Sequence, residues 1–134
     1  MTWPASLALL DAPSLNAEQL GASPTVLVFF SIDCPYCRRH NQRLSALALQ
    51  TSSLRVLGAA LDSDGDALRR YRDTQRLRFA ITPGAQALRE KVTARRVIPF
   101  TAVIAPSGRF LERIPGEMSE SDILGLARWV TTGA

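Results

Sequence analysis

The sequence predicts an α/β fold in which a mixed central sheet is flanked by helices. Over most of the chain, apolar segments of strand length alternate with helical stretches, as in parallel sheets with crossover helices. Near the C-terminal end, two apolar segments flank a short turn and predict an antiparallel hairpin. At 134 residues the chain has the length of one domain. We therefore assign residues 1–134 to a single domain and expect residues 1–13 to be irregular.

The first predicted strand leads directly into the first long helix. Residues 25–30, TVLVFF, are rich in β-branched and aromatic side chains, which is typical of a buried strand. Residues 21–24, GASP, separate this strand from the N-terminal segment. Pro35 suits the first position of a helix, because its missing N–H has no partner there. We expect that helix to extend to about Gln50.

The alternation continues after this helix. Residues 54–61 predict a second strand, and Ser63 or Asp64 can cap a following helix that ends near Arg76. The remaining expected elements are a short strand at residues 79–81, a short helix at 85–92, hairpin strands at 100–105 and 110–114, and a last helix from about 119 to 130.

Charge and hydropathy exclude two broad classes of protein. The net charge is +4, but the arginines are spread along the chain without a block of like charges, which argues against a nucleic-acid partner. No apolar run reaches the ~18 residues of a membrane span. The first residues also lack the basic segment and apolar length of a signal peptide. We therefore expect either a cytosolic protein or a chain from which a leader or an anchor is missing.

The chain contains two cysteines, Cys34 and Cys37, which flank Pro35 and Tyr36. The partial positive charge of a helix N-terminus stabilises a thiolate at Cys34. Cys37 lies one turn further in on the same face, where we expect it to be more buried. From there it can attack a mixed disulfide held on Cys34. The spacing predicts a redox pair, with Cys34 as the nucleophile and Cys37 as the resolving thiol.

Two other interpretations of the cysteines stay open at this point. A zinc or copper site needs further ligands, and the sole histidine, His40, is the nearest soft candidate. Three ligands on less than two turns of one helix do not easily surround a metal ion. The cysteines could also be inert core residues. We expect His40 to be a surface residue, and we predict no metal and no cofactor.

Longer stretches around these residues resemble the thioredoxin superfamily. Residues 24–39, PTVLVFFSIDCPYCRR, resemble the strand, active-site loop and helix start of that fold. Residues 94–129, which begin with ARRVIPF, resemble its cis-proline loop, hairpin and final helix. The intervening residues 56–92 resemble the extra strand and helix of the TlpA/ResA-like branch. Members of this branch are extracytoplasmic thiol–disulfide oxidoreductases.

The resemblance implies specific roles for residues near the cysteines. Pro99 matches the family's cis-proline, and the backbone of Ile98 would then pair with an incoming peptide. Asp33, Pro35 and Tyr36 are expected to modulate thiolate formation at the first cysteine. The implied partners are protein disulfide substrates and a thiol donor that the sequence does not identify. The implied location is periplasmic or otherwise extracytoplasmic, either free or membrane-anchored, while a cytoplasmic location stays open.

Some residues depart from the family pattern. Asp33 stands where the family commonly has tryptophan, Val28 where thioredoxins have a buried aspartate, and Gln42 where a proline often kinks the helix. A carboxylate at Asp33 opposes thiolate formation nearby, so we expect a reductant of extracytoplasmic proteins and not a strong oxidant. Arg95 and Arg96 precede the proline loop and, if they are not simply solvated, would favour an acidic partner.

Alternative functions remain within and outside this family. The tetrapeptide from Cys34 to Cys37 also occurs in glutaredoxins and in periplasmic disulfide isomerases. A disulfide isomerase or oxidase of the same fold is therefore one alternative. A metal-binding or metal-delivery module that uses Cys34 and Cys37 is another, and a binding domain without turnover is a third.

Overall fold

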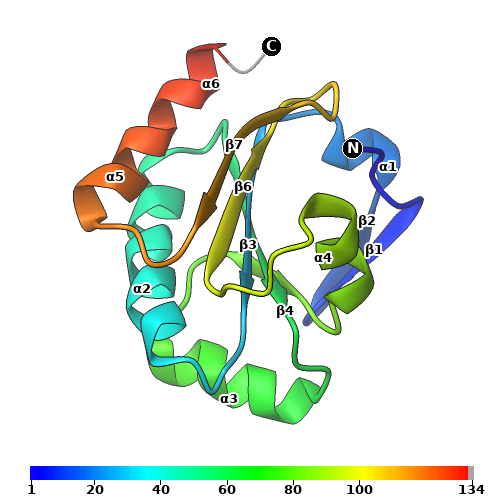
Figure 1. Ribbon diagram of the computed structural model, residues 1–134. Helices are drawn as coiled ribbons and strands as arrows, with labels where there is room; N and C mark the ends of the chain where they lie inside the picture. Colours follow the sequence, from blue (N-terminus) through cyan, green and yellow to red (C-terminus); the bar gives the residue numbers. More distant parts are fainter. Residues whose placement is uncertain (133–134) are drawn as a thin grey trace.

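A five-stranded mixed sheet forms the centre of the computed structural model, which describes residues 1–132 (Figure 1). The strand order is β5-β4-β3-β6-β7. Strand β4 pairs in parallel with β3 and β5, whereas β6 pairs antiparallel with β3 and β7. The predicted mixed sheet is thereby confirmed. The strands are β3 (Thr25–Phe30), β4 (Arg55–Ala60), β5 (Ala80–Thr82), β6 (Phe100–Ile104) and β7 (Phe110–Pro115).

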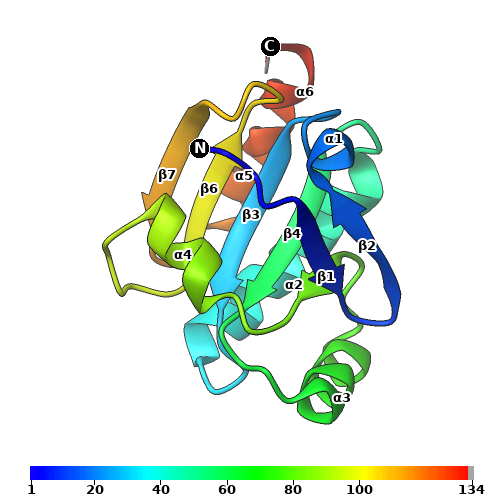
Figure 2. The ribbon, with the colours of Figure 1, turned by 90° about the vertical axis from the view of Figure 1, so that its right-hand side faces the viewer.

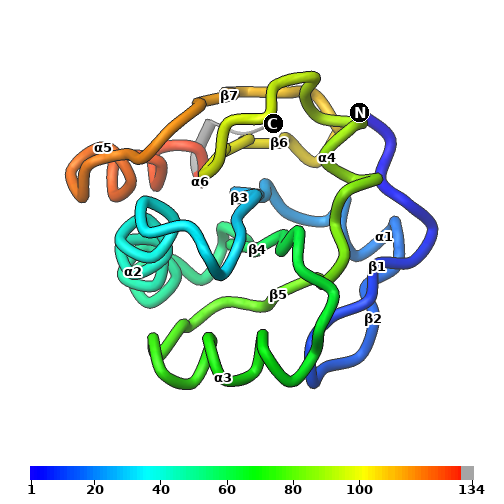
Figure 3. The backbone as a smooth tube through the Cα atoms, turned by 60° about the horizontal axis from the view of Figure 1, so that its bottom comes forward, coloured from blue at the N-terminus to red at the C-terminus, as the bar shows by residue number. Residues whose placement is uncertain are grey.

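Helices cover both faces of this sheet. In Figure 3, α2, α3 and α5 lie on one side of the strands, and α4 lies on the other side. The helices are α1 (Ala17–Leu20), α2 (Pro35–Gln50), α3 (Gly65–Gln75), α4 (Gln86–Val92), α5 (Glu120–Leu124), the 3₁₀ helix η1 (Gly125–Arg128) and α6 (Trp129–Thr132).

Strand β3 contributes to two hydrophobic cores because successive side chains of a strand point to opposite faces. Val28 and Phe30 belong to the core beneath α2 and α3, whereas Leu27 and Phe29 belong to the core beneath α4. All four side chains are fully buried. The strand is therefore fixed in the middle of the sheet, and its C-terminal end opens into the segment that carries the cysteines.

The N-terminal segment differs from our expectation, because residues 1–13 are not irregular. They contain β1 (Ser6–Leu9) and the start of β2 (Ala12–Asn16), which form an antiparallel hairpin. Figure 2 shows this hairpin and α4 in front of the central strands. Leu7 is buried in the core beneath α4, and the Leu10 N–H donates to the Ile81 carbonyl at 2.8 Å. Contacts with the sheet thus stabilise a segment too short to be recognised from its own pattern.

The last helical stretch is also more divided than predicted. Ser119 caps α5 by accepting a hydrogen bond from the Asp122 N–H, as the sequence indicates. Gly125 then ends α5, and a 3₁₀ turn and a short α-helix follow in place of one continuous helix. Glycine is a poor helix former, which accounts for the interruption. Within the described residues, no helix has the length and apolar character needed to cross a membrane.

Candidate active site

Cys34 occupies the N-cap position of α2, directly after the segment that follows β3. Its Sγ accepts a hydrogen bond from the Cys37 N–H at 3.2 Å. Because Pro35 at the first helical position has no N–H, the Cys37 N–H is one of the few free donors of this turn. The sulfur therefore lies at the positive end of the helix dipole with a backbone donor directed at it.

Cys37 lies one turn further along α2 and is in a different environment. Its side chain is fully buried, whereas Cys34 is half-buried, and both residues are free thiols. Burial raises the pKa of the Cys37 thiol well above its ordinary value, and the hydrogen bond with Cys34 and the negative charge of Asp62 raise it further. The two thiols therefore differ in access and in ease of ionisation.

Ile98 and Pro99 meet Cys34 although they lie more than sixty residues away in the sequence. The peptide bond between Ile98 and Pro99 is cis. The Cys34 Sγ lies 3.9 Å from the Ile98 carbonyl oxygen. The Pro99 carbonyl accepts a hydrogen bond from the Gly116 N–H at 2.8 Å, which ties this loop to the segment after β7. The fold therefore places the Ile98 backbone directly beside the half-buried thiol of Cys34.

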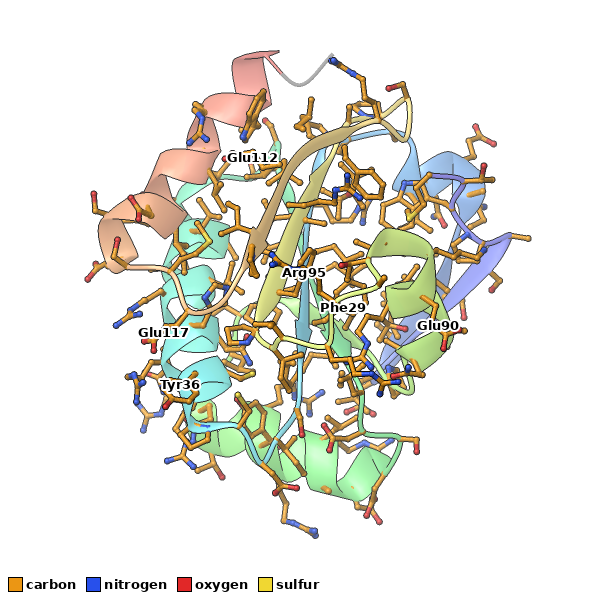
Figure 4. The ribbon with its side chains drawn as sticks, in the orientation of Figure 1. Phe29, Tyr36, Glu90, Arg95, Glu112 and Glu117 are labelled. Carbon is orange, nitrogen blue, oxygen red and sulfur yellow. The ribbon has the colours of Figure 1, made fainter. Side chains whose placement is uncertain are left out.

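The other predicted site residues form an exposed border around Cys34. Asp33, Pro35 and Tyr36 are all exposed, and the Tyr36 side chain lies beside the start of α2 (Figure 4). The Arg39 guanidinium stacks over the Tyr36 ring at 5.3 Å from its centroid. It also makes two hydrogen bonds to the Glu117 carboxylate, at 2.8 and 2.9 Å. Arg39 thus connects this border to the β7–α5 loop.

Asp62 is a component of the site that our sequence analysis did not identify. It follows β4, and its Oδ2 accepts a hydrogen bond from the Ile32 N–H at 3.0 Å. Strands β3 and β4 are parallel neighbours, so Ser31 and Asp62, which follow them, lie at the same end of the sheet. This rule could have indicated Asp62 from the sequence. The contact orders the segment that precedes Cys34.

His40 contradicts our expectation of a surface histidine, because its side chain is fully buried. Its Nδ1 accepts a hydrogen bond from the Met118 N–H at 3.1 Å, so the ring hydrogen of the neutral form is on Nε2. Nε2 then donates to the Thr101 Oγ1 at 3.0 Å. Burial lowers the pKa of His40 to about 4. The residue joins α2 to β6 and to the β7–α5 loop.

The two hydrogen bonds of His40 also affect the interpretation of the cysteines as metal ligands. Both ring nitrogens already have hydrogen-bond partners, so neither is directed at the cysteines as a free ligand. In the part of the chain that the structure describes, no three His, Cys, Asp or Glu side chains gather as a metal site requires. A metal ion at Cys34 and Cys37 would thus have only the two thiols as protein ligands.

A second buried polar contact involves the next residue of the same helix, Asn41. The Asn41 Nδ2 donates to the Tyr71 hydroxyl of α3 at 3.1 Å, and burial raises the pKa of Tyr71. The Asn41 Oδ1 is buried without a hydrogen-bond partner among the described residues. Tyr71 and Cys37 belong to the same hydrophobic core, so this pair lies near the buried thiol. Sequence patterns did not single out either residue.

Comparisons with known proteins identify the fold. No protein-family model matches the chain, and no curated protein sequence matches it. Solved structures, in contrast, are similar to the chain. A secreted disulfide oxidoreductase of Mycobacterium tuberculosis, homologous to E. coli DsbE, superposes with a TM-score of 0.76 at 19% identity, over 92% of this chain and 93% of that protein.

Two further structures give the same result. A secreted thiol–disulfide isomerase of Corynebacterium glutamicum has a TM-score of 0.81 at 17% identity, over 95% of this chain and 83% of that protein. A thioredoxin-family thiol:disulfide interchange protein of Chlorobium tepidum has a TM-score of 0.73 at 20% identity, over 95% of this chain and 97% of that protein. The chain therefore has the thioredoxin-like fold of these thiol–disulfide proteins.

Proposed function

We propose that this protein is a thiol–disulfide oxidoreductase that uses Cys34 and Cys37 to reduce disulfides of extracytoplasmic proteins. The observation that carries the proposal is the arrangement of the two thiols. Cys34 is accessible, lies at a helix N-terminus and accepts the Cys37 N–H, while Cys37 is buried one turn behind it. The similar structures described as secreted disulfide oxidoreductases and isomerases support the class of reaction and the location.

The proposed reaction transfers two electrons from the protein to its substrate. The Cys34 thiolate attacks one sulfur of a substrate disulfide, which breaks the substrate S–S bond and forms a mixed disulfide. The departing substrate sulfur becomes a thiolate that takes up a proton. Cys37 then loses its proton and attacks the Cys34 sulfur, forming the Cys34–Cys37 disulfide and releasing the second substrate thiol. A dithiol donor regenerates the reduced protein, and no cofactor takes part.

The surface around Cys34 suits a peptide substrate. In this proposal the Ile98 backbone pairs with the peptide main chain as an added strand would. Tyr36 and Val97 are exposed by 59% and 46%, which is unusual for side chains of their size and polarity. Tyr36 lies two residues after Cys34 and Val97 lies directly before Ile98, so both can offer apolar contacts to a peptide bound there. Pro99 holds the Ile98 segment in place.

Insulin reduction in dithiothreitol tests the proposed activity. The wild-type protein should accelerate the precipitation of the insulin B chain, and both Cys34→Ser and Cys37→Ser should lose the catalytic turnover. A wild-type protein that leaves the uncatalysed rate unchanged would contradict the proposal. Titration of the reduced protein with Zn²⁺ or Cu⁺ distinguishes the metal-binding alternative, because tight stoichiometric binding without insulin reduction would favour that function.

The direction of the reaction is a separate part of the proposal. A strong oxidant requires a reduced form stabilised by a very acidic nucleophile, and the carboxylate of Asp33 next to Cys34 opposes such stabilisation. Equilibration in glutathione buffers measures the potential. We expect a value clearly more negative than the ~−120 mV of a strong periplasmic oxidant. A potential near that value would overturn the assignment as a reductant while leaving the disulfide chemistry intact.

A further inference from the structure

A cavity of about 240 Å³ lies at the C-terminal end of α4, on the segment that leads to Ile98. Arg89, Arg95 and Arg96 contribute to its lining, together with the amide of Gln86 and the carboxylate of Glu90. The Gln86 Nε2 lies 3.4 Å from the Glu90 Oε1. Figure 4 labels Glu90 on α4 and Arg95 on the α4–β6 connection. Three guanidinium groups against one carboxylate leave this arginine pocket positively charged.

Arg89 is the unusual member of the arginine pocket. The residue is only 9% exposed, yet none of its guanidinium nitrogens is among the buried atoms without a partner in residues 1–132. Elsewhere Arg39, Arg43 and Arg72 each pair with a carboxylate. The Arg89 guanidinium therefore keeps contact with solvent at the pocket, where its N–H groups can donate to an anion. Arg89 thus adds a positive charge to the pocket from the less exposed side of its lining.

The arginine pocket lies close to the candidate active site. Arg96 is two residues before Ile98, and Arg95 is three residues before it. Since an extended chain spans at most ~3.6 Å per residue, their α-carbons lie within about 11 Å of the Ile98 α-carbon. The Ile98 carbonyl oxygen is itself 3.9 Å from the Cys34 Sγ. A peptide bound at Ile98 can thus reach the pocket with a side chain a few residues from its reacting cysteine.

From this we infer that the arginine pocket binds an acidic side chain of the protein substrate, a few residues from the disulfide that Cys34 attacks. The inference rests on the proposed function. A carboxylate matches the planar, forked donors of guanidinium groups and forms charge-assisted hydrogen bonds with them. Glu90 repels such a carboxylate, but the three arginines give the pocket a net positive charge. The pocket thereby selects substrates with acidic residues beside the disulfide.

Single-turnover kinetics with paired peptides test this inference. The pre-reduced protein reacts with excess cyclic disulfide peptide that carries Glu, or in the matched peptide Gln, at the third position outside each cysteine. Acid quenching and chromatography give the second-order rate constant for peptide reduction. At low ionic strength the Glu peptide should react at least about threefold faster, the range of a partly exposed charge contact, and 0.5 M NaCl should reduce this ratio.

Matched variants separate the pocket from the general charge of the protein. In Arg95→Gln/Arg96→Gln, both positions are exposed, so the fold should persist and the Glu-to-Gln ratio should approach one. Arg89→Gln should lower the ratio as well. The control Arg70→Gln/Arg78→Gln removes the same charge from two exposed positions outside the pocket and should keep the wild-type ratio.

The outcomes distinguish this inference from the function on which it rests. Equal rates for the two peptides with the wild-type protein would overturn the pocket assignment alone. So would a ratio that persists in Arg95→Gln/Arg96→Gln, or one that falls to the same extent in the control. A protein that reduces neither peptide would overturn the proposed function and this inference together.

Discussion

Cys34 and Cys37 are one helical turn apart, yet their surroundings assign them different chemistry. Cys34 is at the open end of α2 with a backbone N–H directed at its sulfur. Cys37 is fully buried, and burial raises its pKa far above that of a free thiol. Helix geometry contributes to this contrast, because three residues rotate the chain by most of a turn and place Cys37 against the core.

The contrast predicts selective alkylation. With substoichiometric iodoacetamide at neutral pH, the reduced protein should be modified at Cys34, because only an accessible thiolate reacts quickly. Peptide mapping by mass spectrometry identifies the modified residue. The Cys34→Ser variant is the control, and its remaining thiol at Cys37 should react much more slowly than the wild-type protein. Preferential labelling of Cys37 in the wild type would reverse the assigned roles.

His40 predicts a pH dependence of stability. Its pKa is about 4 in the folded protein against an ordinary 6.5, so the unfolded chain binds the extra proton between these values. Stability should therefore fall as the pH decreases from about 6.5 to about 4, by at most roughly 3 kcal/mol from this residue. Protonation of Nδ1 would also remove the acceptor of the hydrogen bond from the Met118 N–H and bring two hydrogens together.

Urea denaturation of the wild-type protein and of His40→Gln between pH 4 and 7.5 checks this dependence. Glutamine can still accept from the Met118 N–H but does not titrate. Carboxylates such as Glu117, whose pKa the Arg39 hydrogen bond lowers to about 2, contribute to both proteins alike. The difference between the two profiles therefore isolates His40. Profiles that remain parallel over the whole range would contradict the prediction.

At the scale of elements, the parallel strands β3 and β4 organise the site. Their paired carboxyl ends bring the Cys34 segment beside Asp62, whose carboxylate binds the Ile32 N–H. Strand β6 runs antiparallel to β3, so the beginning of β6 reaches the same edge and delivers Ile98 and Pro99. The site is thus a consequence of sheet topology, and each of its three segments lies at a strand end.

Strand β4 depends on a glycine at the position where two aromatic rings meet. A Cβ on Gly58 would lie 2.7 Å from Phe79 Cε1 and 3.1 Å from Phe30 Cε1. Both rings are packed in the core, so Gly58→Ala should destabilise the protein by about 1–3 kcal/mol in urea denaturation. In the control Gly65→Ala, the added Cβ meets only the end of the Arg69 side chain, and we expect a change within ~0.5 kcal/mol. Equal stability of Gly58→Ala and the wild type would refute this interpretation of β4.

The sequence predicts an element well when neighbouring residues stabilise it, and poorly when contacts with distant segments do. Strand β3 and the start of α2 were predictable because an apolar run and a proline at the first helical position are local signals. His40 was misjudged because a histidine on a helix carries no local signal of burial. Its partners Thr101 and Met118 come from distant segments, and only the folded chain brings them together.

At the scale of the whole molecule, the two faces of the sheet form two separate hydrophobic cores. One core, beneath α2 and α3, contains Cys37 and packs against Cys34. The other lies beneath α4 and the N-terminal hairpin, and Ile98 packs against both cores. The N-terminal hairpin escaped prediction because it gains its order from this second core. The arginine pocket escaped it too, since Arg89 and Arg95 are brought to one cavity by the turn after α4.

In the proposed reaction, Cys34 attacks a substrate disulfide and Cys37 then resolves the mixed disulfide. Trapping of this mixed disulfide tests both roles. Reduced Cys37→Ser is mixed with insulin, the free thiols are blocked, and the adducts are separated without reductant and mapped by mass spectrometry. We predict a covalent adduct through Cys34 that dithiothreitol releases, whereas Cys34→Ser should form little or none. Adducts through Cys37 at a comparable level in Cys34→Ser, or no adduct with either variant, would contradict the claim.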